Sequence, residues 1–292
     1  MAAVASGSND LRAETIDGIV KGFALQEYVM KQLVMVNSSN AWKESYYQET
    51  AADLTAQATR SVRGIPRLAA FPFGEVTFQK KSSYQEKYGM EGTISYEDIL
   101  TNEVDVIART LLRIARAVVK AVDTQIWNVL TESQTVVDIN TVAVAAGSEW
   151  DSSTLANRDP IQNILNAIKE IQEDNYNPLA GNGYLVLNPK DFANLLGNAN
   201  VRNAGQFYTD GVTKNGTVGR ILGLTVLVSN TVTADYSAVI IAKECGTWKQ
   251  VVGLTTETID SPGVSKTVRA WEIGVCQLTN PKAVCLISNT AA

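Results

Sequence analysis

The feature that most constrains this sequence is a helical pattern that runs from Tyr96 to about Glu132. No glycine or proline interrupts the chain between Tyr96 and Gly147. Apolar residues recur at three- and four-residue steps, so a helix gathers them on one broad face. At about 1.5 Å per residue the helix would span on the order of 55 Å. A helix of this length favours a flat, extended molecule over a compact sphere.

The N-terminal end and both faces of this helix are marked in the sequence. Ser95 followed by Asp98 has the spacing of a capping box, which satisfies free amides of the first turn. Basic residues at steps of four and three form a stripe opposite the apolar face: Arg109, Arg113, Arg116 and Lys120. This basic stripe is either a solvated surface or a site that meets acidic groups of a neighbouring subunit or a polyanion.

Composition excludes several functional classes. With 45% hydrophobic residues among 292, the chain can bury a sizeable core. Its net charge of −5 argues against a dedicated nucleic-acid binder, because neutralising a phosphate backbone requires concentrated positive charge. No apolar run approaches the roughly 20 residues that span a bilayer, and the first residues lack the pattern of a secretory signal.

Histidine is absent, and cysteine is sparse. The lack of histidine removes the commonest general base and the commonest transition-metal ligand, which lowers the prior for an enzyme. Cys245, Cys276 and Cys285 have no CxxC spacing, so we expect core thiols in a reducing compartment and neither disulfides nor zinc. Asp123 is a lone carboxylate in the long helix, for which a structural ion pair is the favoured role.

The chain before the long helix is predicted to form an arm and a hairpin. Residues 1–9 are small and polar, Asp10–Val36 has an amphipathic helical pattern, and 37–64 is polar with Trp42, Tyr46 and Tyr47 as anchors. Alternation from Ile65 to Met90 predicts a two-stranded hairpin with a polar tip at 80–83. Such a hairpin is marginal alone, so we expect it to contact another subunit through Phe78, Lys80, Lys81, Tyr84, Lys87 and Tyr88.

The chain after the long helix alternates strands and helices before ending in strands. One or two strands are predicted in 134–146, then a linker over 147–158. Asp159-Pro160 and Asn188-Pro189 open helices on either side of a buried strand at 184–187. Residues 197–220 form a predicted loop containing Phe207, Tyr208 and Asp210, whose glycines lack the lysine of a phosphate-binding loop. Further strands are predicted at 221–228, 238–242, 248–252, 254–259, 267–278 and 283–287.

Two short runs carry a resemblance to a known family. The sequence YLVLNPKDFANLL at 184–196, followed by a loop and GRILGLTVLVSNTV at 219–232, resembles major capsid proteins of tailed viruses with the Hong Kong 97 fold. The resemblance implies an α+β fold with five regions. These are an N-terminal arm (1–64), an extended hairpin or E-loop (65–95), a spine helix with the first part of the peripheral domain (96–158), an axial domain (159–233) and a C-terminal, mainly peripheral sheet (234–292).

The same resemblance implies a function. We expect a structural coat protein, without catalytic residues, cofactor or metal, that forms the pentamers and hexamers of an icosahedral shell around double-stranded DNA. Its expected partners are itself, a portal, a decoration protein and a separate scaffold if any, with assembly in the host cytoplasm and no membrane contact. Phe207, Tyr208 and Asp210 would belong to the loop at the capsomer axis. Some members crosslink a hairpin lysine to a neighbour's asparagine, but no motif here identifies that asparagine.

Two other functions fit parts of the sequence. An encapsulin-like compartment shares the architecture and encloses a protein cargo, which co-purifying enzyme or nucleic acid would distinguish. A cytosolic hydrolase that uses carboxylates or cysteine predicts instead a small oligomer with a concave site of perturbed acids.

Overall fold

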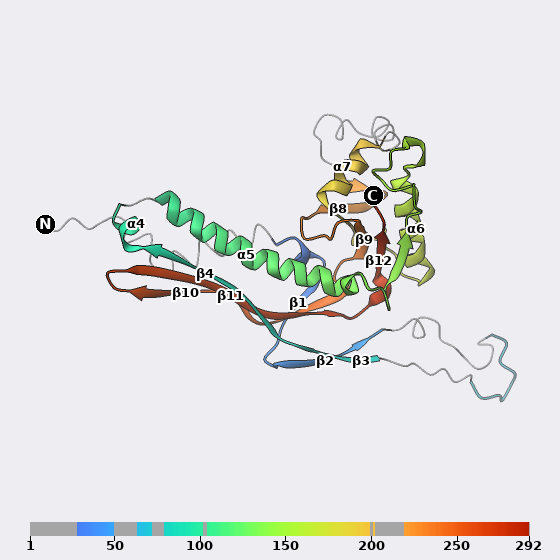
Figure 1. Cartoon of the computed structure of the whole chain (residues 1–292). Coiled ribbons are helices and arrows are strands. Elements are labelled where there is room, and N and C mark those ends of the chain that lie inside the picture. The colour runs from blue at the N-terminus through green and yellow to red at the C-terminus, as the bar shows by residue number, and fades with distance from the viewer. Residues whose placement is uncertain are drawn as a thin grey trace.

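The computed structural model describes residues 28–49, 63–71, 79–101, 104–198, 201 and 219–291. Within them, a long arm of one helix on a sheet meets a second, compact block at one end (Figure 1). The predicted helix start at Asp10, Phe78 of the hairpin, and the axial-loop residues Phe207, Tyr208 and Asp210 lie outside the described residues.

The predicted long helix is present as α4 (Tyr96–Thr101) and α5 (Val104–Leu130). The predicted apolar face is buried along the described part of α5, because three- and four-residue steps place these side chains together. After Leu130 the chain enters a short 3₁₀ turn, η2 (Glu132–Gln134), in which all three residues have positive φ. The buried residues of α5 are Leu111, Ile114, Ala115, Val118, Val119, Val122, Ile126, Trp127 and Leu130.

The sheet under α5 has four strands in the order β1-β10-β11-β4. Helix and sheet enclose a core that includes Ile94, Leu111 and Val268. A Cβ added at Gly92 would lie 2.9 Å from side-chain atoms of both Ile114 and Thr110, so glycine lets the helix lie directly on β4. The strands are β1 (Met35–Ser38), β4 (Glu86–Ser95), β10 (Gly246–Ser261) and β11 (Ser265–Leu278).

The compact block is built on a six-stranded sheet in the order β5-β12-β9-β6-β8-β7. The helices α6 (Pro160–Glu173) and α7 (Pro189–Gly197) begin as predicted, with Asp159 accepting from the amide of Gln162 and Asn188 from that of Lys190. The strands are β5 (Asn140–Ala143), β6 (Gly183–Leu187), β7 (Arg220–Ile221), β8 (Leu224–Val228), β9 (Tyr236–Ile241) and β12 (Val284–Ser288).

The predicted pairing of the hairpin over 65–90 is wrong. Strand β3 (Gln79–Tyr84) pairs antiparallel with β2 (Lys43–Gln48), while β4 pairs with β11 in the four-stranded sheet. Buried Gln85 lies where the chain passes from one sheet to the other. The predicted tip, 80–83, is therefore the middle of a strand. Its polar composition resembled a turn because a two-stranded ladder has little apolar surface to bury.

Smaller expectations also need correction. The helix predicted to reach Val36 has given way to η1 (Met30–Gln32) and β1, and a turn at Leu222-Gly223 with positive φ divides the strand predicted over 221–228. The two strands predicted over 248–259 are one strand, β10, with register shifts after Gln250 and Val252. The last strands do not form one sheet: β9 and β12 join the six-stranded sheet, and β10 and β11 the four-stranded one.

Candidate assembly surfaces

The β2–β3 pair is tied to the rest of the molecule at its base. Glu49, directly after β2, donates its amide to the carbonyl of Thr279 (3.0 Å) and accepts from the hydroxyl of Tyr176 (2.6 Å). On β3, Ser83 accepts from the side chain of Gln277 (2.9 Å). These contacts reach both the end of β11 and the compact block, so the direction in which the pair leaves the molecule is fixed.

A salt bridge joins β3 to the segment between η2 and β5. Lys81 Nζ lies 2.7 Å from Asp138, and both side chains are about one-third exposed. Glu132 positions Asp138, because its carboxylate accepts from the amides of Val137 (2.7 Å) and Asp138 (3.0 Å). Lys81, predicted to contact another subunit, thus has a partner within its own chain. Its predicted role between subunits stays a prediction.

The other predicted hairpin residues fall in two places. Lys80 and Tyr84 are exposed on β3, and Lys43 Nζ lies 5.5 Å from the centre of the Tyr84 ring. Lys87 and Tyr88 are on β4, in the other sheet. The structure therefore does not bring the predicted set together on one surface.

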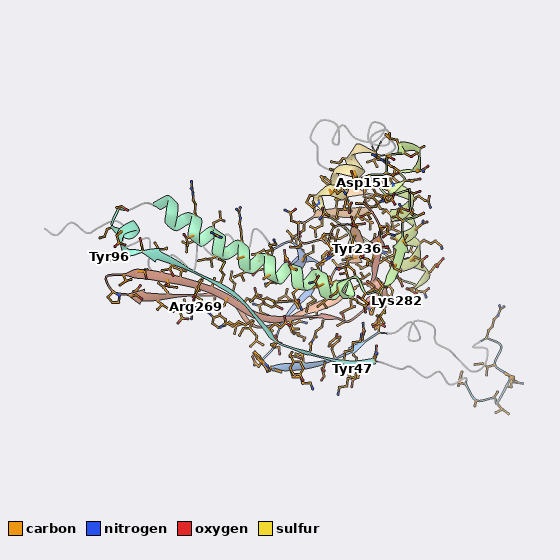
Figure 2. The ribbon with its side chains drawn as sticks, in the orientation of Figure 1. Tyr47, Tyr96, Asp151, Tyr236, Arg269 and Lys282 are labelled. Carbon is orange, nitrogen blue, oxygen red and sulfur yellow. The ribbon has the colours of Figure 1, made fainter. Side chains whose placement is uncertain are left out.

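Lys87 and Tyr88 point to opposite faces of β4, as alternation requires. Lys87 Nζ lies 4.6 Å from the centre of the Trp271 ring, on the face of the sheet away from α5. The same face holds the ion pair between Arg269 and Glu91, which are 2.9 Å apart (Figure 2). Tyr88 is half-buried, with its ring centre 6.0 Å from that of Trp248. Lys87 is thus available to a partner, whereas Tyr88 is largely a core residue.

All four residues of the basic stripe are exposed on α5: Arg109, Arg113, Arg116 and Lys120. The buried side chains of α5 lie between them in the sequence, and the binding role of the stripe stays a prediction. At its C-terminal end the stripe borders a groove of about 510 Å³. Arg116, Lys120 and Asp123 line one side of this groove, Val29 lies beside them, and the turn 228–231 after β8 lines the other.

A buried polar cluster fastens the chain where it enters the described structure. Glu272, with 0% exposure, accepts from the hydroxyl of Tyr28 (2.7 Å) and from Nζ of Lys31 (2.6 Å). Asp123 on α5 accepts from the amide of Val29 (2.9 Å). These contacts tie residues 28–31 to both α5 and β11. We call the set the N-terminal anchor: Tyr28, Val29, Lys31, Asp123 and Glu272.

Burial controls the protonation of this anchor. Removal from water raises the pKa of Asp123 to about 6, against the opposing effect of the Val29 amide. Burial and then the Glu272 charge raise the pKa of the Tyr28 hydroxyl, so it remains a donor. The expected ion pair at Asp123 is instead a hydrogen bond to the backbone. We missed Glu272 in the sequence, although a carboxylate in phase with inward-facing Val268 and Ala270 was a usable signal.

The free end of the long arm exposes apolar side chains. Tyr96 lies at the end farthest from the compact block (Figure 2). Its amide donates to the carbonyl of Val264 in the β10–β11 turn (3.0 Å), and Val264 is 67% exposed. Leu100 on α4 and Ile259 on β10 are also exposed. We call Tyr96, Leu100, Ile259 and Val264 the tip surface.

Nothing in the described residues forms an obvious catalytic or metal centre. Cys245, Cys276 and Cys285 are free and buried, and burial raises the pKa of each thiol. Across the described ranges, no group of three or more potential ligands among histidine, cysteine and carboxylates converges on one point. In the same part of the chain, no helix is long and apolar enough to cross a bilayer.

Comparison with known proteins points in one direction. Residues 80–287 match the sequence model of a family described as phage capsid protein. No curated protein sequence matches the chain.

Similar solved structures include the capsid of cyanophage P-SCSP1u (12% identity, TM-score 0.68, 89% of this chain and 88% of that one). They also include a structure from Mycobacterium phage Che8 (16%, 0.64, 91% and 93%) and a virus-like particle from Pyrococcus furiosus (12%, 0.63, 94% and 98%). At these identities the likeness shows the fold.

Proposed function

Because the chain belongs to the phage capsid protein family, as the match over residues 80–287 establishes, we propose that its capsid shell is built from pentamers and hexamers and encloses double-stranded DNA. The observation that carries this proposal is the division of the molecule into a block that buries its own core and a long arm that ends in exposed apolar side chains. Repeated copies arranged with closed symmetry would cover such surfaces.

The surfaces described above suggest how copies meet. The tip surface and the β2–β3 pair project from the molecule in different directions (Figure 1), so one copy can contact several neighbours. We assign the extended hairpin of this fold to β2, β3 and the chain that joins them, in place of 65–95. Lys80, Tyr84 and Lys87 remain the candidate contacts with neighbours, and Phe207, Tyr208 and Asp210 remain the candidates for the capsomer axis.

The interior is proposed to tolerate DNA without gripping it. A net charge of −5 disfavours tight binding to phosphates, which suits a container whose contents must leave. We expect a structural role without catalysis, with a portal and a scaffold as further partners in the host cytoplasm.

The experiment is an analysis of particles purified from their natural source. The particles are treated with nuclease, which removes external nucleic acid, and then opened and extracted. Protected double-stranded DNA, together with five- and six-fold capsomers in reconstructed electron micrographs, is the expected result. Particles that hold a stoichiometric enzyme and no protected DNA would replace the DNA container with an encapsulin-like compartment.

A further inference from the structure

A lysine, an asparagine and a carboxylate converge in the compact block, at the end that adjoins the arm. Lys282, labelled in Figure 2, has its Nζ 2.9 Å from Oδ1 of Asn140 and 4.0 Å from Oδ2 of Asp174. Asn140 Nδ2 donates to the same carboxylate oxygen (2.6 Å) and lies 3.5 Å from the carbonyl oxygen of Glu170. Each of the three side chains therefore lies close to the other two.

Three separate segments supply this cluster, and the fold of the block brings them together. Asn140 begins β5, Lys282 lies in η4 (Pro281–Ala283) just before β12, and Asp174 is the C-cap residue of α6. Strands β5 and β12 pair in parallel, with Asn140 opposite Cys285, and α6 packs on both strands. The sheet and the helix thus hold Asn140 and Lys282 together, although 142 residues separate them in the chain.

We propose that Lys282 and Asn140 join in a covalent amide bond between their side chains, with Asp174 carrying the proton that the reaction must move. The bond lies within one chain, so it depends neither on a neighbouring subunit nor on the proposed shell. The covalent loop that it closes contains α6, β6 and β9, which form the centre of the block.

The orientation of the Asn140 side chain is the first support. A lysine ammonium group can only donate hydrogen bonds, and a carboxylate can only accept them. The amide oxygen of Asn140 therefore faces Lys282, and the amide nitrogen faces Asp174. This orientation places the attacking amine beside the carbonyl group and a proton acceptor beside the nitrogen that must leave.

Restricted access of water is the second support. The side chains of Lys282 and Asp174 are only 19% and 25% exposed, and Asn140 is half-buried. Groups that a folded protein holds in contact react as if they were highly concentrated. Partial exclusion of water also slows the competing hydrolysis of the asparagine amide. The cluster therefore favours attack by the lysine over attack by water.

The reaction needs no oxidant and no further reactant. Asp174 takes one proton from the Lys282 ammonium group, and the free amine attacks Cγ of Asn140. The bond between Cγ and Nζ forms, and the bond between Cγ and Nδ2 breaks. A second proton passes from Nζ to Nδ2, and Asp174 returns the proton that it took. One ammonium ion leaves, and the carboxylate is restored.

The test is mass spectrometry of the full-length protein after denaturation. We expect the parent chain to be lighter than its sequence by the mass of one ammonia. Trypsin should release a branched peptide that joins positions 140 and 282, because it does not cleave after an acylated lysine.

Two variants and a control identify the reacting groups. Lys282→Arg keeps the positive charge without the amine and should have the full mass of its sequence. Asp174→Asn should slow bond formation in freshly made protein by about 100-fold or more, because the amide cannot accept the proton. The matched control is Lys169→Arg, since Lys169 is 62% exposed on α6 and bonded to Glu173 (3.2 Å), and it should lose ammonia like the parent chain. Circular dichroism checks that each variant is folded.

Four results would count against the proposal. A folded parent chain with the full mass of its sequence would overturn it. Loss of ammonia without the branched peptide would assign the loss to cyclisation at another asparagine. Conversion of Asn140 to aspartate would show that water attacks in place of Lys282. Equal rates of bond formation in Asp174→Asn and the parent chain would remove Asp174 from the reaction.

Discussion

The compact block and the long arm of this molecule bury their apolar surfaces in different ways. In the block, β6, β9 and β12 lie in the interior of the six-stranded sheet and are almost wholly buried, with α6 packed on β12. In the arm, one helix covers one face of β4, β10 and β11, and the far end exposes the tip surface. The block buries the centre of its sheet within one chain, although Leu155 and Leu179 stay exposed, whereas we propose that the arm completes its burial in other copies. Four experiments test this difference.

The largest effect is expected from shortening the connection between β2 and β3. Gln48 and Gln79 are cross-strand neighbours, so replacing residues 50–78 by Asn-Gly leaves a short turn that a hairpin accepts. The subunit should keep its circular dichroism and melting temperature, but it should form no closed shells, because the extension between copies is lost. Normal particles in electron micrographs would remove the β2–β3 connection from the assembly mechanism.

A matched pair of substitutions compares the two regions directly. Ile240→Ala in the block removes a fully buried side chain and should lower the unfolding free energy of the isolated subunit by about 2–5 kcal/mol. Val264→Ser on the tip surface should change that free energy by less than about 0.5 kcal/mol, since the side chain is largely exposed. Val264→Ser should instead raise the subunit concentration at which particles form.

Urea unfolding and light scattering measure these two effects separately. If Val264→Ser destabilised the isolated subunit as much as Ile240→Ala, the tip surface would be part of the fold. Unchanged assembly in Val264→Ser would show that the arm ends without a contact there.

The stability of the block should also depend on pH. Asp191 is buried, accepts from the hydroxyl of Thr290 (2.8 Å), and has a pKa that burial raises from 3.8 to about 6. The folded state therefore binds the proton more tightly than the unfolded chain. The resulting stability, on the order of 2–3 kcal/mol, is fully present below about pH 3.8 and is lost as pH rises through 6.

Asp191→Asn should reduce the dependence of stability on pH between 4 and 6, and Asp123 should account for part of what remains. Urea midpoints of the isolated subunit across this range are the measurement. A variant with the same slope as the parent chain would show that Asp191 does not titrate in this window. Asp123→Asn is the parallel variant in the arm, where the same direction of shift is expected.

The last experiment concerns the salt bridge between Lys81 on β3 and Asp138, for which we expect a small loss of stability. Lys81→Ala breaks the salt bridge to Asp138, which is partly exposed and so should contribute no more than about 1 kcal/mol. Lys80→Ala, on the neighbouring exposed position, is the control. A loss of several kcal/mol in Lys81→Ala alone would mean that the bridge holds the fold itself and not only the direction of the β2–β3 pair.

Elements that local sequence signals mark were predicted correctly, whereas strand pairing and the exposed end of the arm were not. The helices α5, α6 and α7 were predicted because strong periodicity or a capping residue followed by proline marks them locally. Strand β6 was predicted because its residues form a continuous apolar run between turn signals. The pairing of β2 with β3 could not be predicted, since the two strands are separated in the chain and neither has an apolar face. The tip surface was missed for a related reason: its members look like ordinary core residues until the fold places them outside.

The candidate site was predictable in part. The basic stripe was found because helical spacing fixes its geometry. The N-terminal anchor was missed, because it joins residues 28–31 to Asp123 and Glu272 across most of the chain, and only the fold brings them together. The roles of Lys80, Tyr84, Lys87 and the loop residues Phe207, Tyr208 and Asp210 remain predictions.

The central claim, that the arm completes its burial in other copies, is tested most directly by imaging the protein expressed alone. Negative-stain electron microscopy paired with sedimentation should show closed shells tens of nanometres across. A population made only of monomers and small uniform oligomers, even when the neighbouring genes of its source are co-expressed, would contradict the claim.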